Sequence, residues 1–287
     1  MENQGLRINK AIAGAGVCSR RHADDLIRQG RVRVNGQPVL EPGLLLKAGD
    51  RLEIDGKLVS FSAPEQGAVK TGANAGAGSH IYLMLNKPTQ VVSTARDPDG
   101  RPTVLDFLPE AQRGRRLFPV GRLDYFSEGL ILLTDDGALT QRLTHPRHHL
   151  PKYYEVLLRG QVPESALEAM RQGMTLAEGE RLAPVQAERL NPEERGKSAR
   201  PERSAQPGLS DVAPDRIGQA DKNETLRLTL HQGVNRQIRR MCRDLGLTIL
   251  RLRRVGQGPL RLGELPSGKC RPLNEGELTA LFKAVGL

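Results

Sequence analysis

Residues 118–137 read FPVGRLDYFSEGLILLTDDG, two apolar runs separated by a polar loop. The runs FPV and LILLT are typical of buried β-strands, and Asp136-Gly137 is a turn signal. The loop places Asp124 after a strand that would hold it in position, and catalytic groups often lie on such loops. An aspartate in a glycine-flanked loop is also a common turn former or helix cap. The segment by itself therefore supports either role for Asp124.

The sequence on both sides of this segment, over residues 80–287, is mostly strand-like with a few helices. Strand patterns occur at IYLML, LFPV, LILLT, YYEVLL, LRLTL and ILRLRRV. Apolar periodicity predicts helices at 137–144, 163–172, 235–245 and 275–284. Because strands outnumber helices and no regular βαβ alternation is present, we predict an α+β fold with a mainly antiparallel mixed sheet.

Residues 6–66 predict a smaller module. Apolar residues at helical spacing end at Gly16, and Ser19 can cap a second helix. Asn35-Gly36 between two short β-type runs predicts a hairpin. The pattern SRRHADDLIRQGRVRVNG resembles the S4 RNA-binding module, which implies a small αα-plus-hairpin domain that binds RNA. An ordinary αα-hairpin kept soluble by its arginines is the alternative. The side chains expected to meet the phosphate backbone are Arg20, Arg21, Arg31 and Arg33.

Two segments have the composition of linkers. Residues 67–79 are rich in glycine and alanine and show no apolar periodicity, so we predict a flexible linker there. Residues 191–222 lack aromatic side chains and carry many prolines and charges. Strong strand patterns flank this second segment, which predicts a disordered insertion within a domain over 80–287.

The chain of 287 residues is strongly basic, with a net charge of +10. Such an excess favours a polyanionic partner, either nucleic acid or an anionic membrane. No apolar run approaches the roughly 18 residues of a spanning helix, and the N-terminus lacks the apolar core of a signal peptide. We therefore predict a cytoplasmic protein without a membrane partner. The three cysteines lie far apart and form no zinc-binding pattern, so no metal site is predicted.

The segment GRLDYFSEGLILLT resembles the GRLDxxTxGLLLLT motif of pseudouridine synthases, in particular those of the RsuA/RluB type. This resemblance implies that Asp124 is the catalytic carboxylate. Ser127 stands where the family usually has threonine, a change that keeps the hydroxyl. The segment PKYYEVLLRG at 151–160 is similar to the family's KxYxV segment, which implies that Tyr154 packs on the target base. Tyr153, on the opposite face of that strand, is expected to fill the core.

A third segment, HQGVNRQIRRMCRDLGLTILRLRRVGQGPL at 231–260, resembles the family's GxNRQIRRM…LxRVxxGPL block. Asn235 can cap the helix in this block. The resemblance implies that Arg239 pairs with Asp124. Val234 departs from the pattern because relatives often carry a basic residue there. The RNA contacts expected around the catalytic residues are Arg122, Asn235, Arg236, Arg240, Arg251 and Arg253.

A fourth segment, LNKPTQVVSTARDPDGRPTVLDFLP at 85–109, resembles the opening strand and loop of the RluB-like branch. Arg96 and Arg101 lie in this loop and could clamp the RNA. A rigid surface loop set by its prolines and glycine is the alternative. The loop also favours large-subunit over small-subunit ribosomal RNA as the substrate.

The resemblance as a whole implies an RNA-modifying isomerase that converts a uridine of ribosomal RNA to pseudouridine and acts as a monomer without a cofactor. Asp124 is expected to act in its ionised form, which a neighbouring Arg239 would favour, on a base flipped out of its helix. Attack on C1′ and proton removal from C2′ both stay open. The two rivals are a pure RNA-binding factor and a nucleoside-type glycoside hydrolase, for which Glu128, Asp135 and Asp136 are the nearby second carboxylates.

Overall fold

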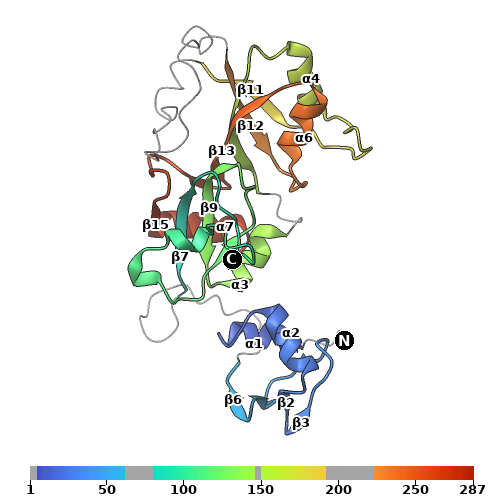
Figure 1. Cartoon of the computed structure of the whole chain (residues 1–287), viewed down its shortest axis with the longest axis vertical. Coiled ribbons are helices and arrows are strands. Elements are labelled where there is room, and N and C mark those ends of the chain that lie inside the picture. The colour runs from blue at the N-terminus through green and yellow to red at the C-terminus, as the bar shows by residue number, and fades with distance from the viewer. Residues whose placement is uncertain (1–4, 62–79, 146–149, 192–222) are drawn as a thin grey trace. The chain divides into compact units, whose positions relative to one another are not determined.

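The computed structural model describes residues 5–61, 80–145, 150–191 and 223–287. The chain divides into two compact units, Met1–Gly78 and Ser79–Leu287 (Figure 1). The linker predicted at 67–79 lies outside the described residues. So does the insertion predicted at 191–222, apart from its first residue.

The N-terminal unit packs two helices against short strands. Ser19 caps the second helix as predicted, with its Oγ accepting a hydrogen bond from the backbone N–H of His22 at 3.1 Å. The predicted hairpin turn is also present, and Asn35 and Gly36 both have positive φ angles, of 52° and 80°. The elements are α1 (Ile8–Gly14), α2 (Arg20–Arg28), β1 (Leu6–Arg7), β2 (Val32–Val34), β3 (Gln37–Pro38), β4 (Leu45–Leu46), β5 (Leu52–Ile54) and β6 (Lys57–Val59).

The second unit is built on one large mixed sheet, in the order β11-β12-β10-β13-β9-β7-β15, with β8 beside β9 and β14 beside β13. All described pairings are antiparallel except that of β13 with β9, which confirms the predicted α+β class. The strands are β7 (Tyr82–Lys87), β8 (Phe118–Val120), β9 (Glu128–Thr134), β10 (Lys152–Leu158), β11 (Gln186–Arg189), β12 (Glu224–Leu230), β13 (Ile249–Gln257), β14 (Leu260–Arg261) and β15 (Cys270–Pro272).

The four helices predicted for this unit all form, with ends within two residues of the expected ones. They are α3 (Gly137–Thr144), α4 (Glu164–Gln172), α6 (Gln237–Asp244) and α7 (Glu275–Ala284). Two 3₁₀ turns, η1 (Val104–Phe107) and η2 (Glu110–Gln112), lie between β7 and β8. One detail was wrong. Asn235 does not cap α6, because Arg236 takes the N-cap position in a left-handed conformation and no side chain caps the helix.

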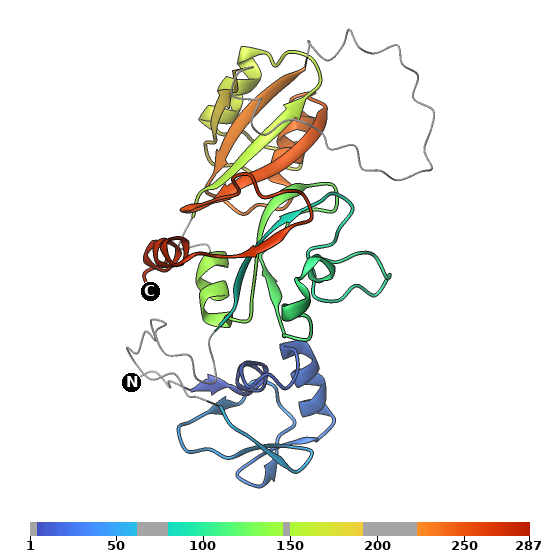
Figure 2. The same cartoon turned by 90° about the vertical axis from the view of Figure 1, so that its left-hand side faces the viewer.

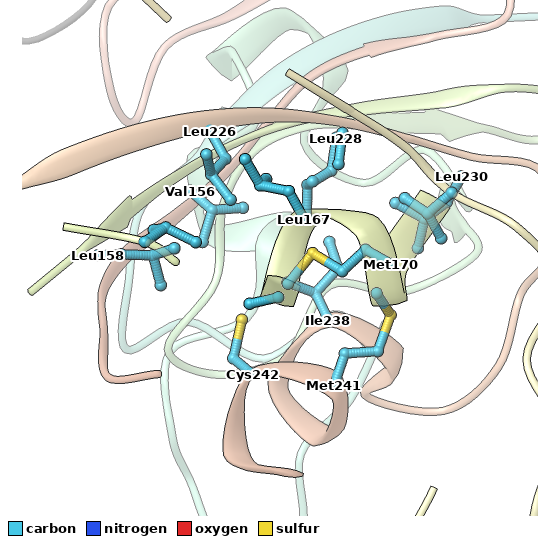
Figure 3. Close-up of a cluster of buried hydrophobic side chains, with 14 of the residues drawn as sticks. Val156, Leu158, Leu167, Met170, Leu226, Leu228, Leu230, Ile238, Met241 and Cys242 are labelled. Carbon is cyan, nitrogen blue, oxygen red and sulfur yellow. The ribbon is translucent and has the colours of Figure 1, made fainter. Parts of the chain in front are cut away.

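The core of this unit has two halves that meet along the middle of the sheet (Figure 2). In one half, α4 and α6 pack their apolar side chains on β10, β12 and β13 (Figure 3). In the other half, β7 and β9 are covered on both faces. Leu130 and Leu132 join the cluster that includes α3 and α7, whereas Ile131 and Leu133 join the cluster that includes η1.

The two halves are joined where β9 pairs with β13 over only two residue pairs. Gly129, which faces Arg254 in this pairing, has a φ of 106°. A Cβ at this position would overlap the backbone of Arg254. The glycine that follows Ser127-Glu128 is therefore required for the halves to approach, and it sets the loop of residues 121–127 at their junction.

Candidate active site

Asp124 lies on the loop of residues 121–127 between β8 and β9. Buried Leu123 fixes the loop, since its carbonyl accepts a hydrogen bond from Ser93 Oγ at 2.8 Å and its N–H donates back to Ser93 at 3.1 Å. The N–H of Ser127 donates to the carbonyl of Asp124 at 3.0 Å and closes a turn. The carboxylate of Asp124 is thus held on a rigid loop with about 30% of its side chain exposed.

Arg239 of α6 lies beside that carboxylate, with 3.6 Å between its Nε and Asp124 Oδ2. Its Nη2 donates to the carbonyl of Phe126 at 2.9 Å and to Ser127 Oγ at 3.0 Å. Burial lowers the pKa of Arg239 below its usual value, and the attraction of Asp124 offsets only part of that effect. An arginine still keeps its charge in this setting. The guanidinium therefore holds the loop through neutral groups and faces the carboxylate as a close cation. The hydroxyl that Ser127 shares with the usual threonine is the one Arg239 binds.

Lys87 is a buried lysine under the same loop, and the motifs did not single it out. Its side chain is 0% exposed, and its Nζ donates to the carbonyls of Pro88 and Ser127, both at 2.8 Å. Burial lowers the pKa of Lys87 to about 8, against the attraction of Asp124 and Glu128. A lysine that ends a buried apolar strand and precedes a proline was the available signal in the sequence.

Tyr154 lies on β10 opposite Arg254 of β13, and so on the face of the sheet that carries Leu252 and Val156. Its ring is half-buried and packs against both the α4–α6 cluster and the cluster that contains Leu123. It thus bridges the two halves of the core next to the loop that carries Asp124. Tyr153 points to the other face, where the guanidinium of Arg261 lies 4.1 Å from its ring centroid.

The arginines of β13 divide between the two faces. Arg254 shares the face of Tyr154, is buried, and donates through Nε to the carbonyl of Leu130 at 2.7 Å. Arg251 and Arg253 pair with Leu157 and Glu155 in the register, and so lie on the opposite face, where Arg251 also forms an ion pair with Glu128. The structure therefore does not gather Arg251 and Arg253 on the side of Tyr154.

The remaining positions expected to contact RNA around Asp124 differ in how they are paired. Arg240 is engaged by Glu178 and Glu180, at 3.2 and 2.6 Å. Arg101 is engaged by Asp97 and Asp99, both at 2.7 Å, and its bonds to Asp97 lower the pKa of that carboxyl to about 2. The exposed side chains with no hydrogen bond or ion pair to any described residue are Arg96, Arg122, Asn235 and Arg236.

In the N-terminal unit the four predicted arginines are all exposed. Arg31 makes a two-pronged ion pair with Asp55, with N–O distances of 2.8 and 2.6 Å. Arg20, Arg21 and Arg33 make no ion pair with any residue in the described ranges. Three of the four guanidinium groups are therefore available to a phosphate backbone.

The described part of the chain offers neither a metal site nor a membrane-spanning helix. No group of three His, Cys, Asp or Glu side chains there could hold a metal ion. No helix there is long and apolar enough to cross a membrane.

Taken together, the junction presents one partly exposed carboxylate, a close cation and an aromatic wall. The guanidinium of Arg239 and the carboxylate of Asp124 attract each other across 3.6 Å. An ionised carboxylate held in this way can act as a nucleophile or as a base on a ligand that enters the junction.

Comparison with known proteins agrees with this geometry. Residues 81–244 match the family described as RNA pseudouridylate synthase, and residues 6–52 match the S4 domain. The chain is 38% identical to an uncharacterized RNA pseudouridine synthase of Aquifex aeolicus, over 98% of this chain and 96% of the relative. It is 33% identical to ribosomal large subunit pseudouridine synthase B of Bacillus subtilis, over 96% of this chain and 95% of the relative.

A solved structure described as a crystal structure of pseudouridylate synthase superposes with a TM-score of 0.58 at 29% identity, and covers 96% of this chain and 99% of the other. The family match spans more than half of the chain, and the relatives align along nearly all of it. The chain is an S4-containing enzyme that belongs to the family of RNA pseudouridine synthases.

Proposed function

We propose that this enzyme isomerises one specific uridine of ribosomal RNA to pseudouridine, with large-subunit RNA as its substrate and Asp124 as its catalytic carboxylate. The 33% identity to a ribosomal large subunit pseudouridine synthase supports the choice of substrate. The observation that supports the choice of residue is the pairing of Asp124 with Arg239 on the rigid loop between the two halves of the core.

In this reaction the N1–C1′ bond of uridine breaks, the base turns, and C5 bonds to C1′. The proton on C5 is lost and N1 takes one up, so atoms balance without an oxidant, a reductant or water. Asp124 serves as the ionised group that attacks C1′ or removes the C2′ proton. Arg239 lies beside that carboxylate and holds the loop through Phe126 and Ser127.

The freed base must stay close while it turns. Tyr154 offers a half-buried ring beside the loop, and stacking on such a ring helps to repay the few kcal/mol that base flipping costs. Arg122, exposed on the catalytic loop, is placed to fill the space the base leaves or to bind a phosphate. Asp124, Arg239 and Tyr154 all come from one chain, so a monomer suffices for the chemistry.

The hydrolase alternative needs a second carboxylate near the scissile bond. The three candidates are engaged elsewhere. Glu128 pairs with Arg251, and Asp135 pairs with His80 and Arg115. Asp136 caps α3 through two backbone N–H groups. None of the three is left to activate a water beside Asp124.

The test is to incubate the enzyme with unmodified ribosomal RNA fragments and to map pseudouridine by carbodiimide adducts and primer extension. We expect one modified site that disappears with Asp124→Asn while RNA binding survives. Glu110→Gln, an exposed carboxylate with no ion pair in the described residues, is the matched control and should modify normally. Wild-type activity in Asp124→Asn would refute the catalytic role, and release of free uracil would favour the hydrolase.

A further inference from the structure

The ring of Phe126, two residues after Asp124, stands out because 61% of the side chain is exposed. It is the only aromatic among the large hydrophobic side chains exposed in the described part of the chain. The whole sequence has only five phenylalanines and four tyrosines, and no tryptophan. A phenylalanine left in water forgoes the free energy that burial of its ring would contribute to folding. Its place beside the catalytic carboxylate is therefore not explained by the fold.

Phe126 is held in position by its backbone and not by its ring. Its carbonyl accepts a hydrogen bond from Arg239 at 2.9 Å, and the next residue, Ser127, is only 2% exposed. The carbonyl of Tyr125 accepts a hydrogen bond from the N–H of Gln90 at 2.7 Å. The Tyr125 ring meets the Phe126 ring edge to face, with centroids 5.0 Å apart. The exposed ring therefore stands on a pre-organised support, so little entropy is lost when a ligand packs on it.

The charges around Phe126 indicate what kind of ligand would pack on it. Arg122 is exposed on the same loop and makes no ion pair with a described residue. Arg236, exposed at the start of α6, lies close enough to act electrostatically on Arg239. A flat apolar ring on the loop that carries Arg122, with Arg239 hydrogen-bonded to its backbone, fits a single-stranded nucleic acid, because arginines meet its phosphates and aromatic rings stack on its bases. An apolar protein partner would leave these arginines without counter-charges.

We propose that Phe126 stacks on the base of a nucleotide that flanks the target uridine; this rests on the function proposed above. When the uridine leaves its helix, the neighbouring base loses a stacking partner, and the Phe126 ring replaces it. Stacking on an aromatic ring strengthens binding of a base and depends little on the identity of that base. Phe126 is thus a positioning residue that holds the opened strand over Asp124 and takes no part in bond breaking.

The experiment combines protein variants with altered RNA. Phe126→Ala, Phe126→Leu and Phe126→Trp are assayed on the ribosomal RNA fragment in which the modified uridine is mapped. Each is also assayed on that fragment with one flanking nucleotide made abasic. On intact RNA, we expect Phe126→Ala to raise KM about tenfold with kcat nearly unchanged, and Phe126→Trp to restore KM. On RNA that is abasic at the stacked position, the KM of wild type should rise about tenfold. The KM of Phe126→Ala should be the same on abasic and intact RNA.

A merely structural role of Phe126 would lower the Tm of the Ala variant and would not depend on the abasic site. An unchanged KM in Phe126→Ala would overturn the proposal. So would a further rise in the KM of Phe126→Ala on abasic RNA, because the effects of the substitution and of the missing base would then be independent. If Phe126→Leu restored KM as completely as Phe126→Trp, plain apolar contact would account for the effect without stacking. That result would also overturn the proposal.

Binding to a uridine nonamer, measured in the Asp124→Asn background, separates this proposal from the function on which it rests. If Asp124→Asn still modifies RNA but Phe126→Ala binds the nonamer about tenfold more weakly, only the catalytic assignment fails. If Asp124→Asn is inactive and Phe126→Ala binds like its parent, only the stacking role fails.

Discussion

Arg239 and Arg240 are neighbours on α6, yet their side chains meet very different surroundings. Arg239 is half-buried, faces one carboxylate at 3.6 Å and makes its hydrogen bonds to a carbonyl and a hydroxyl. Arg240 points to the loop that follows α4, where Glu178 and Glu180 bind it at 3.2 and 2.6 Å. The pKa of Arg239 is lowered by burial, whereas hydrogen bonds to the two glutamates raise the pKa of Arg240.

The two sites differ in how the carboxylates are hydrogen-bonded. Glu178 and Glu180 accept hydrogen bonds directly from arginine N–H groups, so their charges are used within the protein. Asp124 has Arg239 near it but accepts no short hydrogen bond from it. The Nη2 of Arg239 donates instead to the carbonyl of Phe126 and to Ser127 Oγ. Its oxygens stay open for a substrate while their charge is still compensated. The ion pair that we propose to be catalytic and a structural ion pair thus involve neighbouring arginines.

The largest expected effect comes from removing the catalytic partner. Arg239→Ala should lower kcat by about 10²–10³-fold, a loss typical of removing one preorganised electrostatic group. Arg239→Lys should recover only part of it, because a lysine cannot span both the loop and the carboxylate. Single-turnover measurements on the mapped RNA fragment would check this. Arg240→Ala is the matched control, and a loss as large as that of Arg239→Ala would abolish the contrast between the two arginines.

A medium effect concerns Lys87, the second cation near Asp124. Its pKa of about 8 in the folded protein lies below the usual value of 10.5. Between these values the unfolded chain binds more protons, so this group makes the folded state more stable as pH rises from 8 to 10.5. Relative to Lys87→Met, the wild-type free energy of unfolding should therefore gain about 2–3 kcal/mol across that window. Below pH 8 the two proteins should show parallel pH dependence.

Urea unfolding at several pH values, followed by circular dichroism, would measure this difference. A methionine keeps the apolar stem and removes the titrating group, so the subtraction isolates Lys87 from tyrosines and other lysines. Parallel curves from pH 8 to 10.5 would mean that the amine is solvated and that burial does not hold its pKa down.

The smallest effect is expected from the structural pairs. Glu178→Gln combined with Glu180→Gln should change stability by less than about 1 kcal/mol, because exposed ion pairs contribute little. The same change frees Arg240, whereas Arg243 keeps its pairing with Asp244. RNA affinity at low salt should rise a few-fold, and its dependence on log salt should steepen by about one phosphate contact. Glu168→Gln on α4 serves as the control, and an unchanged salt slope would show that Arg240 lies off the RNA path.

Much of the architecture could be read from local patterns. Ser19, Asn35-Gly36 and the four helices of the second unit follow from caps, turn residues and apolar periodicity, which act over a few neighbouring residues. Asn235 was wrong as a cap because the chain enters α6 through a left-handed Arg236, which no propensity rule favours. Lys87 was missed because its role depends on the carbonyl of Ser127, forty residues away.

The sequence by itself determined the elements, the two-unit composition and the motif that carries Asp124, because each depends on local preferences or on residues kept together in the chain. The tertiary structure decided which of many arginines meets Asp124 and which are bound by glutamates. It also placed Arg251 and Arg253 on the face opposite Tyr154, and left the Phe126 ring in solvent. These outcomes depend on strand register and on helix packing across the sheet, which bring together residues 60 to 113 positions apart.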